Sequence, residues 1–168
     1  FLHDNLALAG LAMMPPPTHA APAPATRIIP ADGRRLPVVG LGTWQTFDVG
    51  ADATARANLG RVMERFVELG GEVIDSSPMY ASAEGVVGDL ARERGLRPRL
   101  FLATKVWTQG KAAGIAQMQQ SLRRLGSERI ELMQVHNLLD WQQHLPTLRA
   151  WKAEGRIRYL GISHYAAS

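Results

Sequence analysis

The chain has 168 residues, of which 46% are hydrophobic and 20% are charged, a composition typical of one folded domain and not of a disordered chain. The net charge is +4, from 19 Lys and Arg residues against 15 Asp and Glu residues. The basic residues are scattered and form no clustered stripe, which argues against nucleic-acid binding. The absence of Cys excludes disulfides and thiolate chemistry, and no ligand spacing typical of zinc occurs, so a metal site is not expected.

Residues 1–25 combine a short apolar run with a Pro- and Ala-rich stretch and are expected to lie outside the fold. The run from Leu6 to Met14 is too short to cross a bilayer, so no stable membrane insertion is expected. The pattern is typical of the remnant of a bacterial export signal, and the opening Phe1 and Leu2 would follow a twin-arginine pair. We therefore expect either export to the periplasm or a disordered leader on a cytoplasmic protein.

From residue 26 onward, short apolar segments alternate with amphipathic ones. Residues 26–37 place two extended runs around an Ala-Asp-Gly turn, which predicts a β-hairpin. Later strands are expected at 38–44, 71–75, 99–105, 129–136 and 157–163. Helices are expected at 52–69, 82–94, 111–125 and 141–154.

The first of these helices has a recognisable start and an apolar face. Asp52 precedes it as a candidate N-cap. The apolar residues expected on one helical face are Leu59, Val62, Met63, Phe66 and Val67.

Strands that alternate with helices of this length imply βαβ units and a parallel sheet, for which two architectures compete. A doubly wound dinucleotide-binding sheet should carry a Gly-rich turn directly before its first helix, and residues 40–47 lack both the third glycine and the helix. Polar residues at successive strand ends favour an α/β fold of the (β/α)8 TIM-barrel type. Because a full barrel takes about 250 residues, residues 26–168 are expected to form a partial barrel. It would contain the N-terminal hairpin and about the first five β/α units, with the C-terminal strands missing.

Four polar residues lie at or just past the ends of successive expected strands, namely Asp75, Lys105, His136 and Ser163. Because neighbouring strands lie about 4.8 Å apart, these side chains can converge at the C-terminal face, where barrel enzymes carry their chemistry. Tyr80 follows Asp75 in a loop that a proline stiffens. The sequence therefore predicts one pocket with an aspartate, a tyrosine, a lysine and a histidine.

Such a set of side chains suits proton donation by a phenol. A tyrosine with its reference pKa of about 10 is a slow acid at neutral pH, and a Lys105 cation about 4 Å away would stabilise the phenolate by about 4 kcal/mol. Asp75 would hold Lys105 in place and charged. Neutral His136 would donate a hydrogen bond to a substrate oxygen and orient it.

Each of these residues also has a structural interpretation when it is taken alone. Asp75 can start a turn, Tyr80 can pack against the core, and a histidine that ends a strand is more often structural than catalytic. Lys105 is different, because a lysine at the end of an apolar buried strand needs a partner. Compatible groups at equivalent positions of successive strands favour the functional interpretation.

Together these segments resemble the N-terminal portion of the aldo-keto reductase superfamily over residues 27–168. The hairpin and GLGTW resemble the start of that family, IDSSPMYASAE its aspartate-to-tyrosine segment, and ATKVW its lysine strand. MQVHN resembles its histidine strand and GISHY its nicotinamide-holding strand. The segments agree in order and spacing, which makes the resemblance specific.

The resemblance implies an NAD(P)H-dependent oxidoreductase that reduces an aldehyde or ketone to an alcohol, with NADPH as the preferred cofactor and NADH as the alternative. Tyr80 would be the general acid, and Lys105 and Asp75 would tune it. His136, the fourth catalytic residue, would orient the carbonyl. The implied cofactor-binding residues are Thr43, Trp44, Asp75, Ser163 and His164. The implied substrate-binding residues are Trp44, Trp107, Tyr80 and His136, although the two tryptophans can equally pack at the barrel rim.

Two departures from the family pattern leave other functions open. His164 stands where the family often has Asn, and the family loops that grip the cofactor pyrophosphate and adenosine belong to later strands. The alternatives are a non-catalytic, nicotinamide-binding regulatory subunit and an inactive truncated barrel fragment. The expected partner is a small-molecule carbonyl substrate, and not a nucleic acid.

Overall fold

The computed structural model describes residues 23–165 and contains a five-stranded parallel sheet with the strand order β3-β4-β5-β6-β7. The strands are β3 (Leu41–Gly42), β4 (Val73–Asp75), β5 (Phe101–Val106), β6 (Ile130–His136) and β7 (Ile157–Ser163). Strands that pair in sequence order are those of a (β/α)8 barrel, so the predicted partial barrel is confirmed. The leader expected at residues 1–25 lies outside the described residues except for its end, and it stays a prediction.

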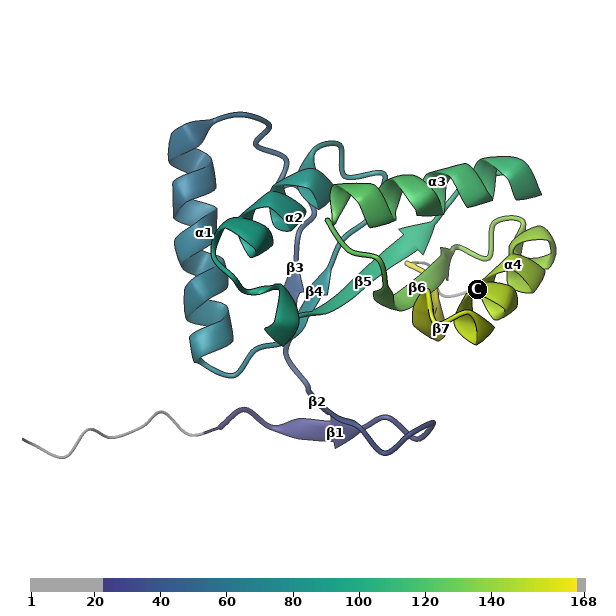
Figure 1. Cartoon of the computed structure of the whole chain (residues 1–168), viewed down its shortest axis with the longest axis horizontal. Helices are drawn as coiled ribbons and strands as arrows, with labels where there is room; N and C mark the ends of the chain where they lie inside the picture. Colours follow the sequence, from purple (N-terminus) through teal and green to yellow (C-terminus); the bar gives the residue numbers. More distant parts are fainter. Residues whose placement is uncertain (1–22, 166–168) are drawn as a thin grey trace, which may run out of the picture.

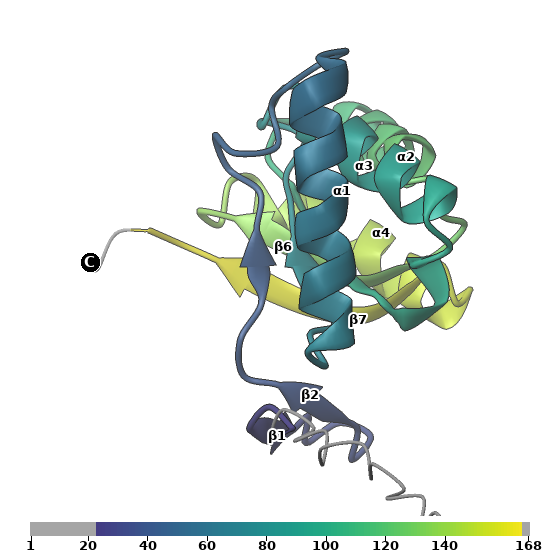
Figure 2. The same cartoon turned by 90° about the vertical axis from the view of Figure 1, so that its left-hand side faces the viewer.

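Each of the four helices in the described part of the chain lies on the same side of the curved sheet (Figures 1 and 2). They are α1 (Ala53–Glu68), α2 (Ala83–Glu93), α3 (Lys111–Arg124) and α4 (Trp141–Ala153), with a short 3-10 turn at Arg97–Arg99. All four agree with the expected ranges to within one residue at each end. Because the crossovers place the helices on one side, the other side of the sheet is the barrel interior.

Helix α1 begins as expected, and its apolar face is only partly buried. Asp52 caps it, since its carboxylate accepts a hydrogen bond from the backbone N–H of Ala55 at 2.9 Å. On its apolar face Met63 and Val67 are buried, whereas Val62 is 47% exposed. Val62 borders a recess beside the edge strand β3, which pairs only with β4 in the described part of the chain.

Strand β3 is much shorter than the predicted strand at 38–44. Val38 and Val39 are 51% and 65% exposed, because this segment leads from the hairpin to the sheet and belongs to neither. Val38 N still donates to Ala25 O at 3.0 Å, beside the hairpin. The hairpin itself forms as predicted, from the antiparallel strands β1 (Thr26–Ile28) and β2 (Arg35–Pro37).

The hairpin lies at the end of the sheet where the strands begin (Figures 1 and 2). Its turn residue Asp32 accepts hydrogen bonds from the Tyr159 hydroxyl at 2.6 Å, from the Arg34 backbone N–H at 3.1 Å and from the Arg158 guanidinium at 2.6 Å. These hydrogen bonds, of which the one from Tyr159 has the largest effect, lower the pKa of Asp32 to about 2. The hairpin is thereby fixed to β7, and the opposite end of the strands stays free for a site.

The stagger between neighbouring strands brings polar side chains to that opposite end. Lys105 on β5 pairs with Gln134 on β6, and His136, two residues further on, pairs with Ser163 on β7. Asp75 on β4 pairs with Ala103 on β5, two residues before Lys105. This stagger is that of tilted barrel strands. Because side chains also alternate along each strand, Asp75, Lys105, Gln134 and His136 share the interior face of the sheet.

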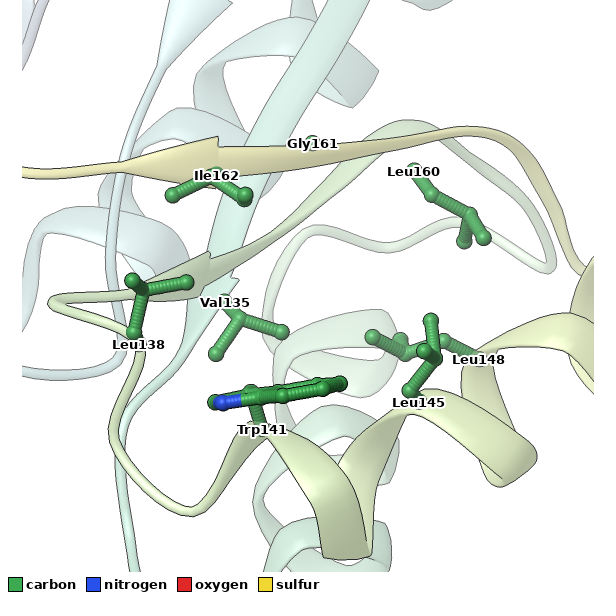
Figure 3. Close-up of a pocket in the computed structure, with 8 residues that line it drawn as sticks. All are labelled: Val135, Leu138, Trp141, Leu145, Leu148, Leu160, Gly161 and Ile162. Atoms are coloured by element: carbon green, nitrogen blue, oxygen red, sulfur yellow. The ribbon is translucent and has the colours of Figure 1, made fainter.

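An apolar recess lies on the outer side of the sheet, between α4 and strands β6 and β7 (Figure 3). It is lined by Val135, Leu138, Trp141, Leu145, Leu148, Leu160, Gly161 and Ile162. Because side chains alternate along a strand, Val135 faces this recess while His136 faces the interior. No lining residue has an ionisable side chain, so the recess offers no acid or base for chemistry.

Candidate active site

Lys105 and Asp75 form the centre of the site, at the C-terminal ends of β5 and β4. The Lys105 ammonium donates to a carboxylate oxygen of Asp75 at 2.6 Å and to the backbone carbonyl oxygen of Ser76 at 2.8 Å. The Lys105 side chain is 4% exposed, whereas that of Asp75 is 40% exposed. A buried ammonium needs such acceptors, and they explain how an otherwise apolar strand can end in a lysine.

Tyr80 lies against the same lysine, in the loop between β4 and α2. The Lys105 nitrogen lies 5.3 Å from the centre of the Tyr80 ring, which is within the range of a cation–π contact. The loop backbone fixes the residue, because its N–H donates to Ser77 O at 3.1 Å and its carbonyl accepts from Ala83 N at 2.9 Å. The structure therefore brings together the phenol and the ammonium that the sequence predicts to act as one unit.

His136 ends β6 beside Ser163 at the end of β7. Its Nδ1 atom lies 3.3 Å from the Ser163 hydroxyl oxygen. Burial and then the positive charge of Lys105 lower the pKa of His136 below its ordinary value, while a hydrogen bond to the Ser163 backbone acts in the opposite direction. The ring is therefore neutral at pH 7. When Nδ1 accepts from the hydroxyl, Nε2 carries the proton and can donate it to a substrate oxygen.

Aromatic side chains border this group of polar residues. Trp107 follows β5, is 43% exposed and meets the His136 ring edge-on, with 6.0 Å between the ring centres. Gln117 holds the Trp107 backbone, since its side-chain oxygen accepts from Trp107 N at 2.7 Å. Trp44 is 65% exposed after β3. Tyr165, which sequence reasoning did not select, has its ring centre 6.1 Å from that of His136.

The residues expected to bind the cofactor differ in accessibility. Thr43 is fully buried, and its hydroxyl donates to the backbone carbonyl oxygen of Asp75 at 3.0 Å, so it anchors the end of β4. Ser163 is half-buried. His164 is exposed and stacks on the ring of Tyr165 at 6.0 Å between centres. The cofactor roles of these residues stay predictions.

Sequence reasoning missed one polar side chain of the barrel interior. Gln134 Nε2 donates to the second carboxylate oxygen of Asp75 at 3.0 Å. A signal was present, because Gln134 interrupts an apolar strand two residues before His136 and must share its face.

A buried carboxylate behind the site was also missed. Glu84 in α2 is fully buried and accepts a hydrogen bond from the Thr104 hydroxyl at 2.7 Å, while Arg124 of α3 lies 3.7 Å away. Burial raises the pKa of Glu84 above its ordinary value, and the Thr104 contact opposes this shift. Since Thr104 directly precedes Lys105, this contact ties α2 to the strand that carries the lysine. Helical spacing gives no sign that a glutamate is buried.

The loops after β3 and β4 are tied to each other above the strands. The Ser82 hydroxyl and N–H donate to Asp48 at 2.6 and 3.1 Å, and these bonds lower the pKa of Asp48. Gly50 N donates in turn to the Ser82 hydroxyl oxygen at 3.0 Å. The loop that carries Trp44 and the loop that carries Tyr80 therefore hold one another.

The described part of the chain offers neither a metal centre nor a membrane-spanning helix. Between residues 23 and 165, no His, Asp and Glu side chains gather in threes as metal ligands would. Over the same residues, no helix has the length and apolar character needed to cross a bilayer.

Comparison with known proteins places this arrangement in a family. Residues 38–168 match the family model described as the aldo/keto reductase family. The chain belongs to this family. Its sequence is 35% identical over 135 residues to the methylglyoxal reductase YeaE of Escherichia coli strain K12, a match that covers 77% of this chain and 46% of that protein.

Solved aldo/keto reductases share the fold. An aldo-keto reductase from Klebsiella pneumoniae in complex with NADPH is 33% identical, with a TM-score of 0.69, over 80% of this chain and 48% of that one. An aldo-keto reductase from Bacillus halodurans in its holo form is 28% identical, with a TM-score of 0.66, over 83% of this chain and 50% of that one. The chain therefore spans about half the length of the aldo/keto reductases that it matches.

Proposed function

We propose that the full-length protein containing this chain is an NADPH-dependent carbonyl reductase in which Tyr80 protonates the oxygen of an aldehyde or ketone. The observation that carries the proposal is the Lys105 ammonium, which lies 2.6 Å from Asp75 and 5.3 Å from the centre of the Tyr80 ring. A nicotinamide cofactor, when bound, would supply the hydride for the carbonyl carbon.

Lys105 assists Tyr80 through its charge. As the Tyr80 proton moves to the substrate, negative charge grows on the phenolic oxygen, and a neighbouring cation in a water-poor site stabilises it. Asp75 and the carbonyl oxygen of Ser76 each accept one N–H of the ammonium and fix its position. The third N–H remains available on the side of Tyr80.

His136 serves as a neutral hydrogen-bond donor in this proposal. Its lowered pKa keeps the ring uncharged at pH 7, so it does not compete with Tyr80 as a strong acid. Its Nε2–H would bind the carbonyl oxygen and hold it for protonation. Trp107, which meets the imidazole edge-on at 6.0 Å, would form one wall of the substrate pocket.

The end of β7 offers groups that fit a carboxamide such as that of nicotinamide. The side-chain oxygen of Asn137 is buried and accepts no hydrogen bond from a described residue. The Asn137 backbone N–H donates to Ser163 O at 2.7 Å, so the two residues are neighbours at the ends of β6 and β7. An acceptor of this kind and a serine hydroxyl match the NH2 and C=O groups of a carboxamide. Ser163 and Asn137 would therefore hold that amide.

Relatives suggest where to begin with cofactor and substrate. The Klebsiella pneumoniae structure contains NADPH, and the Escherichia coli relative is named a methylglyoxal reductase. We therefore propose NADPH as the cofactor and small aldehydes, with methylglyoxal among them, as the first substrates to test.

The proposal is tested with the full-length gene product that contains residues 1–168. NADPH consumption is followed with a panel of aldehydes and ketones, first for the wild type and then for Tyr80→Phe. Because a positioned general acid contributes about 10²–10⁴-fold, we expect kcat of Tyr80→Phe to fall by at least about a hundredfold while NADPH still binds.

Tyr159→Phe is the matched control. It removes a tyrosine hydroxyl at the hairpin end of β7, where the hydroxyl bonds Asp32, and it should leave kcat unchanged. Unchanged turnover in Tyr80→Phe would refute Tyr80 as the acid. Tight NADPH binding without turnover on any carbonyl would favour the regulatory, nicotinamide-binding alternative.

A further inference from the structure

Gln134 contacts the ionic pair of the site from a third strand. Its side-chain nitrogen lies 3.0 Å from Asp75 Oδ1, while Lys105 holds Asp75 Oδ2 at 2.6 Å. We propose that Gln134 is a positioning residue, whose amide holds the Asp75 carboxylate in the orientation that directs the Lys105 ammonium at Tyr80. This inference deepens the proposed carbonyl reduction and rests on it.

The strand register makes this contact possible. Gln134 pairs with Lys105 on β5, and Asp75 lies one strand further on, on β4. The Gln134 side chain must therefore reach across β5 to meet Asp75. The β5 residue that pairs with Asp75 is Ala103, whose small side chain leaves room for this crossing.

Gly161 on the other neighbouring strand provides room for the glutamine as well. It pairs with Gln134 across β6 and β7. A Cβ atom at Gly161 would lie 3.2 Å from Gln134 Cγ and 3.0 Å from Leu132 Cδ1, closer than side chains normally pack. The absence of a side chain at Gly161 therefore lets Gln134 take the conformation in which it meets Asp75.

The contact fixes one orientation of the carboxylate. Only the amide nitrogen of Gln134 can face Asp75, since a carboxylate oxygen accepts and does not donate. With Lys105 on one oxygen and Gln134 on the other, the carboxylate cannot rotate about its Cβ–Cγ bond without losing both bonds. Without the amide, the carboxylate can turn, and the ammonium that it holds turns with it.

The first experiment replaces the amide with an apolar group of similar shape. In the full-length protein, Gln134→Met should lower kcat about tenfold to a hundredfold, the range expected for losing a hydrogen bond to a charged group. The affinity for NADPH and the far-UV circular dichroism should stay as in the wild type. Gln120→Met, at an exposed position of α3, is the control and should leave kcat unchanged.

Gln134→Glu gives a signature that a purely structural residue would not show. The new carboxylate would face Asp75 and repel it, and two carboxyl groups this close share one proton as the pH falls. A protonated carboxyl group can donate as the amide does, so kcat relative to wild type should recover on the acid side. The other titratable groups near this position, Lys105, His136 and Tyr80, are the same in Gln134→Met, which should show no recovery.

Gly161→Ala tests the same contact without changing the glutamine. Its new methyl group would crowd Gln134 Cγ at 3.2 Å and Leu132 Cδ1 at 3.0 Å. The glutamine must then shift, so kcat should fall in the same direction as in Gln134→Met, but by less, with NADPH binding retained. Wild-type kcat in Gln134→Met, or equal acid-side behaviour of Gln134→Met and Gln134→Glu, overturns this inference while the reductase assignment stands. A wild-type protein that reduces no carbonyl overturns both.

Discussion

The Lys105 ammonium lies 2.6 Å from a carboxylate oxygen of Asp75, but the two side chains are buried to very different extents. The Lys105 side chain is 4% exposed and that of Asp75 is 40% exposed, so the cation is shielded from water while the carboxylate still contacts water. The pair is therefore unequal. Loss of the aspartate leaves a charge inside the protein, whereas loss of the lysine leaves a carboxylate that water can solvate.

Asp75→Asn should therefore destabilise the protein more than Lys105→Met does. For Asp75→Asn we expect the free energy of unfolding to fall by about 1–3 kcal/mol, because the buried ammonium loses its ionic acceptor. In the double variant, the second substitution removes the unpaired charge and should recover part of this loss. Urea unfolding of the four proteins measures the effect, and strictly additive changes would contradict it. Catalysis should be lost in all three variants.

The sequence pattern was sufficient for the order of the strands but not for the length of the first. Alternating strands and helices predict five parallel strands because each unit pairs locally with the previous one. Strand β3 is short because only Leu41 and Gly42 pair with β4, and the apolar pattern of residues 38–44 contains no information about where that pairing begins and ends. Val62 lies on the apolar face of α1 and still stays 47% exposed, since the flank of α1 beside β3 is uncovered in the described part of the chain.

That Asp75, Lys105 and His136 lie together could be predicted, because they occupy equivalent positions at strand ends, and Tyr80 lies in the loop that follows one of these strands. Their catalytic roles stay predictions. The contact between Gln134 and Asp75 could not be predicted, because it joins strands that are not neighbours and depends on the stagger between them. Glu84 was missed for another reason, since its burial results from the packing of α2 and α3 against β5 and leaves no periodic trace.

His136 should titrate below its ordinary value in the folded protein. Burial is the main cause and the Lys105 cation the second, so Lys105→Met should raise the pKa of His136 while leaving it below the ordinary value. Proton NMR titration of the imidazole signals measures both values, with His136→Gln used to assign the resonance. A pKa that does not respond to Lys105→Met would show that the lysine charge does not reach the ring.

The same shift predicts how stability depends on pH. Because the folded pKa of His136 is lowered, the unfolded chain binds the proton more readily. The free energy of unfolding should therefore fall as the pH drops below about 6.5, the ordinary histidine value. His136→Gln should lose this part of the pH dependence, and thermal unfolding across that range measures it.

Gln117 should control substrate binding through Trp107. Its side chain accepts from Trp107 N at 2.7 Å and donates to Trp107 O at 3.3 Å, and so clamps the backbone beside the proposed pocket. Gln117→Met should raise KM for the carbonyl about fivefold, the equivalent of about 1 kcal/mol for a neutral hydrogen bond, with kcat close to wild type. Steady-state kinetics of Gln117→Met, with Gln120→Met as the control, measures KM and kcat separately. A fall in kcat with an unchanged KM would contradict this prediction.

Asp32 should stabilise the docking of the hairpin in a pH-dependent way. Its pKa is lowered from 3.8 to about 2 in the folded protein by Tyr159, Arg34 and Arg158. Since the folded state binds this proton less readily than the unfolded state, the stabilisation is complete above about pH 4 and disappears as the pH falls towards about 2. Asp32→Asn should therefore be less stable than wild type at neutral pH, with a difference that shrinks as the pH falls.

Urea unfolding at neutral pH and at several acid pH values measures this difference. Glu128→Gln, which removes an exposed carboxylate elsewhere, controls for the change in net charge. Tyr159→Phe removes the largest cause of the shift, so Asp32 should then bind its proton at a higher pH, and the acid-dependent loss of stability should begin at a higher pH than in wild type. A difference between Asp32→Asn and wild type that stays constant from neutral to acid pH would show that Asp32 supports the hairpin by shape and not by charge.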